Sequence, residues 1–164
     1  PYVHIGLIPR QAGFAIFDRE LGNKLVGPDT EGERVRIEGR VLDGLGAPCR
    51  DVLVEMWQAD SSGRYGSDDF QGFGRTGTDF ETGLYWFDTV KPGRVQGRAG
   101  QPKMAPHLTL WLTARGINIG LFTRMYFADE EQANSEDPVL ALVEPHRRPT
   151  LLAAREMRSD CVVY

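Results

Sequence analysis

Two residues of this chain could take part in metal chemistry, and each stands in a recognisable local context. Tyr65 follows Gly63 and Arg64, and His107 opens the apolar run HLTLWLT. Phenolate oxygen and imidazole nitrogen both bind ferric iron. A second imidazole two residues after His107 would share its strand face, but Thr109 stands there and is a poor ligand. Taken alone, the pattern is more typical of a packed tyrosine and a hydrogen-bonded histidine.

Arg115 is a candidate for binding an anion, because it stands at the end of a predicted strand, directly before Gly116. An arginine in a cleft pairs with a carboxylate through two hydrogen bonds, whereas an exposed arginine in a surface salt bridge contributes little. The sequence fits both interpretations equally. The aspartates between Asp60 and Asp79 lack the spacing of a calcium loop and indicate a solvated loop instead.

Short strands separated by turns rich in Gly and Pro must position these residues. Alternating apolar side chains predict strands over residues 34–41, 52–58, 84–90, 107–114 and 117–127. The short link between the first two strands predicts a hairpin. The polar, Gly-rich stretch 59–79 is predicted to be one long loop.

The C-terminal part predicts helical turns and a last hairpin. Residues 128–143 are acidic and then apolar, which indicates one or two helical turns broken by Pro138. Residues 150–157 and 161–164 predict a hairpin about Ser159-Asp160.

Together these elements predict an all-β fold, an antiparallel β-sandwich with long loops and short helical turns. We expect a single domain over residues 1–164. Its N-terminal arm and loops would span residues 1–33, and its sandwich core residues 34–164.

Composition and charge exclude several classes of protein. The 164 residues are 41% hydrophobic and 26% charged, as in ordinary globular domains. A net charge of -4 with dispersed Lys and Arg leaves no basic stripe for nucleic acid. No apolar run approaches the ~20 residues that span a bilayer, so we expect no membrane partner. Two cysteines without a CxxC pattern indicate a reducing compartment, and the cytoplasm is the expected location.

Three longer segments carry a resemblance to a known family. They are VEMWQADSSGRY (54–65), GFGRTGTDFETGLYWFDTVKPG (72–93) and MAPHLTLWLTARGINIGLFTRMYF (104–127). In order and spacing these segments resemble the intradiol ring-cleaving dioxygenases, and the opening PYVHIGL agrees with them. The resemblance implies a β-sandwich of the intradiol dioxygenase type. Family members hold a non-haem ferric iron with two tyrosinates and two histidines, in the motifs Gly-Arg-Tyr, Lys-Pro-Gly-x-Tyr and Arg-Pro-x-His-x-His.

Only two of the four iron ligands implied by this resemblance are present. Tyr65 and His107 match the first tyrosine and the first histidine. Val95 stands at the second tyrosine and Thr109 at the second histidine. One tyrosine and one histidine cannot complete the coordination sphere of Fe(III). We therefore expect a degenerate iron site at these four positions and no metal bound by this chain.

Within the family, the resemblance is closest to the iron-free chain of a two-chain enzyme, whose homologous partner binds Fe(III). It implies a hetero-oligomer that cleaves the aromatic acid 3,4-dihydroxybenzoate with O2 to 3-carboxy-cis,cis-muconate in aromatic catabolism. This chain alone would supply no catalytic residue. Pro1, Tyr2 and Arg115 would line the partner's substrate cleft, where the arginine attracts the substrate's carboxylate. The alternative, from a different class, is a catalytically silent assembly or adaptor subunit.

Overall fold

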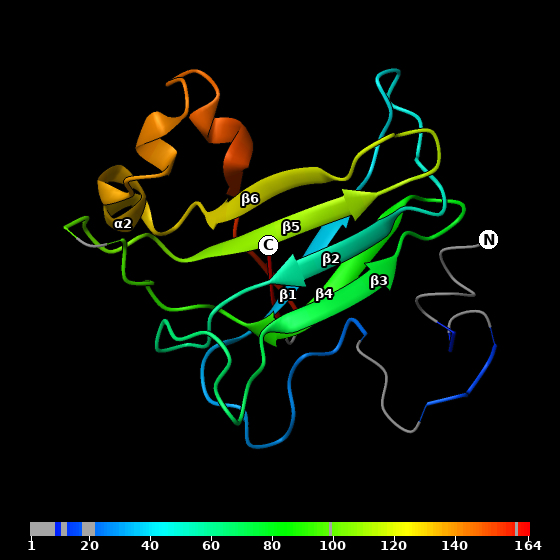
Figure 1. Cartoon of the computed structure of the whole chain (residues 1–164), viewed down its shortest axis with the longest axis horizontal. Coiled ribbons are helices and arrows are strands. Elements are labelled where there is room, and N and C mark those ends of the chain that lie inside the picture. Colours follow the sequence, from blue (N-terminus) through cyan, green and yellow to red (C-terminus); the bar gives the residue numbers. More distant parts are fainter. Residues whose placement is uncertain (1–8, 11–12, 18–21, 99, 160) are drawn as a thin grey trace.

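The computed structural model describes residues 9–10, 13–17, 22–98, 100–159 and 161–164. Pro1 and Tyr2, and part of the predicted N-terminal arm, lie outside the described residues. In the part that is described, two β-sheets pack face to face, and a small helical lobe stands at one end of them (Figure 1).

One sheet has the strand order β4-β1-β9-β8 and the other the order β3-β2-β5-β6-β7. The strands are β1 (Arg34–Arg40), β2 (Leu53–Trp57), β3 (Phe73–Gly77), β4 (Leu84–Val90), β5 (His107–Thr113), β6 (Leu121–Phe127), β7 (Leu152–Ala153), β8 (Glu156–Arg158) and β9 (Cys161–Val163). The predicted β-sandwich is confirmed. The parallel pairs β1–β9 and β6–β7 make both sheets mixed.

The helical lobe follows β6 and consists of α2 (Glu131–Glu136) and the 3₁₀ helices η1 (Leu140–Leu142) and η2 (Arg148–Leu151). The predicted helical turns are confirmed, because α2 and η1 lie on either side of Pro138. No helix within the described ranges has the length and apolar character that crossing a membrane requires.

The core lies between the two sheets and follows from the alternation in the sequence. Successive side chains of a strand point to opposite faces, so every second residue is directed inward. The inward residues include Ile37, Val54, Met56, Phe87, Leu108 and Phe127, all fully buried. Burying an aliphatic or aromatic side chain of this size contributes about 1.5–3 kcal/mol.

Two predictions about the strands are wrong. β1 and β2 form no hairpin, since β1 pairs with β4 and β9 while β2 pairs with β3 and β5 in the other sheet. The connection over 41–52 is long enough to cross from one sheet to the other. Both strands have an apolar inner face, so the two sheets pack face to face. The predicted loop over 59–79 contains β3. The glycines of β3 interrupt the alternating pattern that marks a strand. Leu25 packs so close to the backbone of Gly74 that a side chain there would overlap it.

The other predicted strands are confirmed, although β6 begins at Leu121 rather than at residue 117. The C-terminal hairpin is confirmed in its last part by the antiparallel pairing of β8 with β9. Asp160, which the prediction placed at the centre of the hairpin, lies outside the described residues. Residues 150–153 belong instead to η2 and β7.

A charged cluster fastens the C-terminal strand to the rest of the sandwich. Lys91 Nζ lies 2.9 Å from Asp129 Oδ2 and 2.7 Å from Glu130 Oε1. The hydroxyl of Tyr164 donates to the same Asp129 oxygen at 2.9 Å. Burial acts to lower the pKa of Lys91, but its hydrogen bonds to the two carboxylates raise that pKa above its ordinary value. The ammonium group therefore stays charged and joins three segments of the chain.

Leu108 and Leu142 form a matched pair that tests where the core lies. Leu108 is fully buried, whereas Leu142 is 84% exposed. Leu108→Ala is expected to lower the free energy of unfolding by about 2–5 kcal/mol, because a cavity replaces the lost side chain. Leu142→Ala should change it by no more than about 0.5 kcal/mol. Urea unfolding of both variants checks this, and equal losses would contradict the assigned core.

Asp129 gives the charged cluster a defined pH dependence. Burial acts to raise the pKa of Asp129, but hydrogen bonds from Lys91 and Tyr164 hold it below its ordinary value. A carboxylate of this kind stabilises the fold at pH values above the pKa that it has in the unfolded chain, which is about 4. The stabilisation is lost as pH falls through the lower pKa of the folded state. Asp129→Asn is therefore expected to reduce stability at pH 7 and to flatten the loss of stability below about pH 4. Urea unfolding between neutral and acid pH measures both slopes, and identical acid slopes would contradict the assignment.

Candidate functional site

Two loops are pressed together where the predicted site residues lie. The β2–β3 connection carries Tyr65, and the β4–β5 connection carries Val95. Gly63 has φ +84° and lies so close to the carbonyl oxygen of Arg94 that a Cβ atom would overlap it. Only glycine accommodates both the positive φ and this approach. The amide of Met104 then donates to the carbonyl of Val95 at 2.8 Å and turns the second loop back toward β5.

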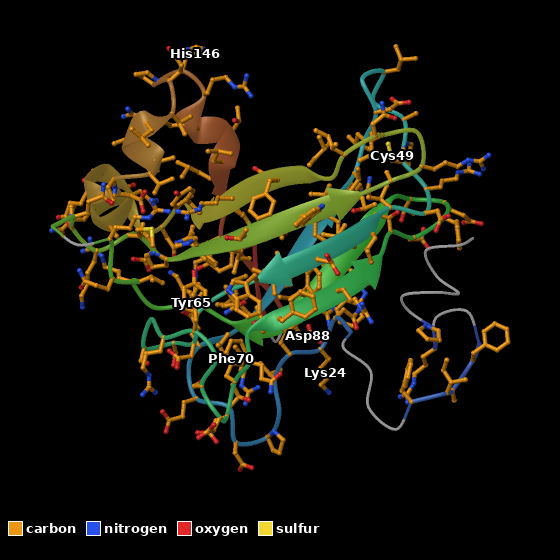
Figure 2. The ribbon with its side chains drawn as sticks, in the orientation of Figure 1. Lys24, Cys49, Tyr65, Phe70, Asp88 and His146 are labelled. Carbon is orange, nitrogen blue, oxygen red and sulfur yellow. The ribbon has the colours of Figure 1, made fainter. Side chains whose placement is uncertain are left out.

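The structure brings His107 and Tyr65 together at this end of β5. His107 is 1% exposed, and its Nδ1 lies 2.8 Å from the carbonyl oxygen of Ala105. A carbonyl only accepts, so Nδ1 carries the proton, and Nε2 of the neutral ring is left as an acceptor. The hydroxyl of Tyr65 lies 3.5 Å from Nε2, a long contact for a hydrogen bond. The tyrosine ring stacks on Trp57, with centroids 6.0 Å apart. Figure 2 shows Tyr65 far from Cys49, which lies near the opposite end of the sandwich.

The surroundings favour the neutral form of both groups. Burial lowers the pKa of His107, and the positive charge of Arg124 lowers it further. Burial raises the pKa of Tyr65, and Arg124 opposes that rise only in part. The pair is therefore an imidazole and a phenol, whereas an iron-bound tyrosine would be a phenolate.

The other two predicted positions contribute no ligand. Val95 is buried and has only hydrocarbon in its side chain. Thr109 stands on β5 opposite Arg124 of the neighbouring strand β6. From there the guanidinium of Arg124 lies 3.5 Å from Met104 Sδ and 3.4 Å from the hydroxyl of Tyr126. A fixed positive charge thus faces the pair of His107 and Tyr65.

These residues do not fit a ferric ion. Tyr65 and His107 are the two positions of the four that offer suitable donor atoms, and those atoms lie against each other. The guanidinium of Arg124 would repel a trivalent cation placed beside it. Within the described ranges, no group of three or more His, Cys, Asp or Glu side chains could hold a metal ion. The donor set of this chain is therefore incomplete for Fe(III).

Asp137 positions the site and was not singled out from the sequence. Its fully buried carboxylate accepts the amide hydrogen of Ala105 at 2.7 Å and two amides that follow α2 at 2.6 and 2.8 Å. The hydroxyl of Tyr126 also donates to it, at 3.3 Å. The helical lobe thereby fixes the segment that leads into His107. An Asp directly before Pro138 was the available signal, because Asp side chains bond to backbone amides at such turns.

Arg115 lies away from this site. It is exposed, in the turn after β5 where the amide of Ile117 donates to the carbonyl of Ala114 at 3.4 Å. His107 is the first residue of β5, and the strand to Thr113 rises about 20 Å. Arg115 is therefore separated from the degenerate iron site of its own chain by the full length of β5.

Comparisons with known proteins agree with this geometry. Residues 11–163 match the family described as "Dioxygenase". The chain is 50% identical over 161 residues to the protocatechuate 3,4-dioxygenase alpha chain of Pseudomonas putida, with 94% of this chain and 80% of that one covered. The chain belongs to the intradiol dioxygenase family. This member is also 39% identical to the corresponding alpha chain of Burkholderia cepacia, with 95% and 80% covered, and 38% identical to a beta chain from the same species, with 76% and 54% covered.

Solved structures of intradiol dioxygenases share the fold. The dioxygenase domain of a dioxygenase and carbohydrate-binding fusion protein from Streptomyces sp. SirexAA-E superposes with a TM-score of 0.68 at 26% identity, covering 86% of this chain and 81% of that one. The 3-chlorocatechol 1,2-dioxygenase of Rhodococcus opacus 1CP gives a TM-score of 0.70 at 24% identity, covering 92% and 67%. The second likeness concerns the fold alone.

Iron uptake by the purified chain tests the degenerate site. With ferric ion supplied as a weak chelate, the wild-type chain is expected to develop no visible tyrosinate-to-iron absorption, because two donors cannot complete the sphere. Restoring both ligands in one variant, Val95→Tyr with Thr109→His, is expected to produce that absorption, and each single change should not. Coloured iron bound stoichiometrically by the wild-type chain would refute the assignment.

Proposed function

We propose that this chain is the iron-free alpha subunit of a protocatechuate 3,4-dioxygenase and works in complex with a homologous iron-binding beta chain. The complex cleaves 3,4-dihydroxybenzoate between its two hydroxyl-bearing carbons. Both atoms of O2 enter the product, 3-carboxy-cis,cis-muconate. The observation that carries the proposal is the pairing of His107 with Tyr65 beside Val95 and Thr109, a donor set unfit for iron, in a chain 50% identical to a named alpha chain.

The proposed partner holds the Fe(III) centre. Its chemistry, chelation of the catechol oxygens and activation of the ring toward O2, is thus supplied outside this chain. The likeness of this sequence to both an alpha and a beta chain of one enzyme supports a pair of related subunits. The cytoplasm is the proposed location, and the free thiols of Cys49 and Cys161 are consistent with a reducing compartment.

Arg115, with Pro1 and Tyr2, is proposed to line the substrate cleft of the beta chain. Its guanidinium is exposed, and none of the described residues forms an ion pair with it. A planar guanidinium matches a carboxylate through two parallel hydrogen bonds. Arg115 would therefore attract and orient the carboxylate of the aromatic acid while the iron binds its two hydroxyl oxygens.

The substitution Arg115→Ala in the assembled enzyme tests this role. Loss of a charge-assisted hydrogen bond worth about 1–3 kcal/mol is expected to lower kcat/KM roughly 5- to 150-fold, with iron content and assembly unchanged. Arg147→Ala is the matched control, because Arg147 is exposed in the helical lobe. Steady-state kinetics with 3,4-dihydroxybenzoate provide the measurement.

If neither substitution changes the kinetics, the chain is a catalytically silent assembly subunit instead. A substrate analogue without the carboxylate provides a further control. Its turnover should be insensitive to Arg115→Ala, because the guanidinium then has no partner to lose.

A further inference from the structure

A row of side chains crosses the outer face of the five-stranded sheet beside the degenerate iron site. Trp57 of β2 stands opposite Thr109 of β5, and Thr109 stands opposite Arg124 of β6 (Figure 1). Leu108 and Leu110 point into the core, so Thr109 between them points outward. Paired strands lie about 4.8 Å apart, which separates the Cα atoms of Trp57 and Arg124 by about 10 Å. An indole and a guanidinium therefore stand on either side of a small residue with a hydroxyl group.

The guanidinium of Arg124 lacks a carboxylate partner. The side chain is half-buried, and none of the described residues forms an ion pair with it. Its contacts with Met104 Sδ at 3.5 Å and with the hydroxyl of Tyr126 at 3.4 Å are both long, and a thioether is a weak acceptor.

The carboxylate of Asp137 reaches Arg124 only through the hydroxyl of Tyr126. That carboxylate already accepts three backbone amides at 2.6 to 2.8 Å. A charge withdrawn from water is ordinarily stabilised by an opposite charge beside it. The surroundings of Arg124 therefore suit an added anion.

Two aromatic rings lie at the other side of Thr109. Trp57 is 43% exposed and Tyr65 is 39% exposed, and their rings are nearly parallel, with an interplanar angle of 11°. Rings of this kind offer a flat apolar surface on which a planar ligand can pack. The hydroxyl of Tyr65 makes only a long contact with His107, so it can donate to an anion instead, whereas a phenolate would repel one.

We propose that Trp57, Tyr65 and Arg124 form a binding site for an aromatic carboxylate. The carboxylate pairs with the guanidinium of Arg124 through two parallel hydrogen bonds, and the ring of the ligand packs on the exposed side of the indole. A guanidinium recognises the carboxylate group and requires no hydroxyl group on the ring. The inference goes beyond the proposed function, because it concerns ligand binding by this chain itself, without a beta chain and without iron.

Binding of benzoate to the full chain, followed by ligand-observed NMR, tests the site. Arg124→Gln is expected to weaken binding by about 10-fold or more, because the charge is lost. Arg147→Gln removes an exposed arginine of the helical lobe and should leave the affinity unchanged. Benzamide, a neutral molecule of the same shape, is expected to bind the wild-type chain about 10-fold or more less tightly than benzoate. Circular dichroism and urea midpoints verify that each variant is folded.

Thr109→Phe provides a second variant that keeps the charge. The new ring would lie between the indole and the guanidinium, and it is expected to weaken benzoate binding by about 10-fold or more, through exclusion of the ligand. Acetate and inorganic phosphate carry charge without a ring and are expected to bind about 5-fold or more less tightly than benzoate. Equal affinities for benzoate and for either of these anions would overturn the aromatic part of the site.

The remaining outcomes separate this inference from the proposed function. Unchanged benzoate binding in Arg124→Gln, or no binding by the wild-type chain, overturns the site. Loss of binding in Arg115→Ala rather than in Arg124→Gln places the anion at the far end of β5, which also overturns the site. None of these results alters the proposed function, because that function is tested by the kinetics of the assembled enzyme.

Discussion

The contact between Tyr65 and His107 is the constraint on which the site depends. In an iron-binding relative both groups would point at a metal, whereas here the phenol hydroxyl lies 3.5 Å from the imidazole nitrogen. The other ring nitrogen, Nδ1, is fixed by the carbonyl of Ala105. The amide of Ala105 in turn donates to the buried carboxylate of Asp137. The fold around the former site is thus maintained by hydrogen bonds that require no metal.

The loss of two donors changes what the chain can do without changing its architecture. A valine at position 95 and a threonine at position 109 are compatible with the buried loop and the strand face they occupy, so the sandwich tolerates them. Arg124 supplies a fixed positive charge beside the remaining pair, close to where a cation would have been needed. The contribution to chemistry that we propose for this chain lies at the far end of β5, at Arg115.

Strand β5 therefore separates two ends of different character. The His107 end is enclosed by two loops and by the helical lobe (Figure 1). The Arg115 end is exposed to solvent and carries apolar side chains beside the guanidinium of Arg115. The role that we propose for Arg115 requires an exposed cation at this end of the strand.

The sequence predicted the parts of the fold that have local causes. β5 and β4 were predictable because alternating residues are buried on one face, and Pro138 marked the break between α2 and η1. The pairing partners of β1 and β2 were not predictable. Whether two consecutive strands pair edge to edge in one sheet or lie in two sheets that pack face to face depends on contacts far apart in the sequence. β3 was hidden by its glycines.

The site divides in the same way between local and distant causes. Tyr65 and His107 could be named as candidates from their residue types, but nothing in their spacing brings them together, and only the resemblance to the family did. Asp137 and Arg124 act across the fold from other elements. The Asp-Pro pair at 137–138 signals a turn, but no local pattern places either residue at the site.

The most direct measurement of the central claim is the iron content of the assembled enzyme, determined together with its electron paramagnetic resonance spectrum. The account predicts one high-spin ferric ion for each pair of chains, in a single environment that belongs to the beta chain. Two ferric ions for each pair, with a second signal that disappears when Tyr65 or His107 is replaced, would contradict it.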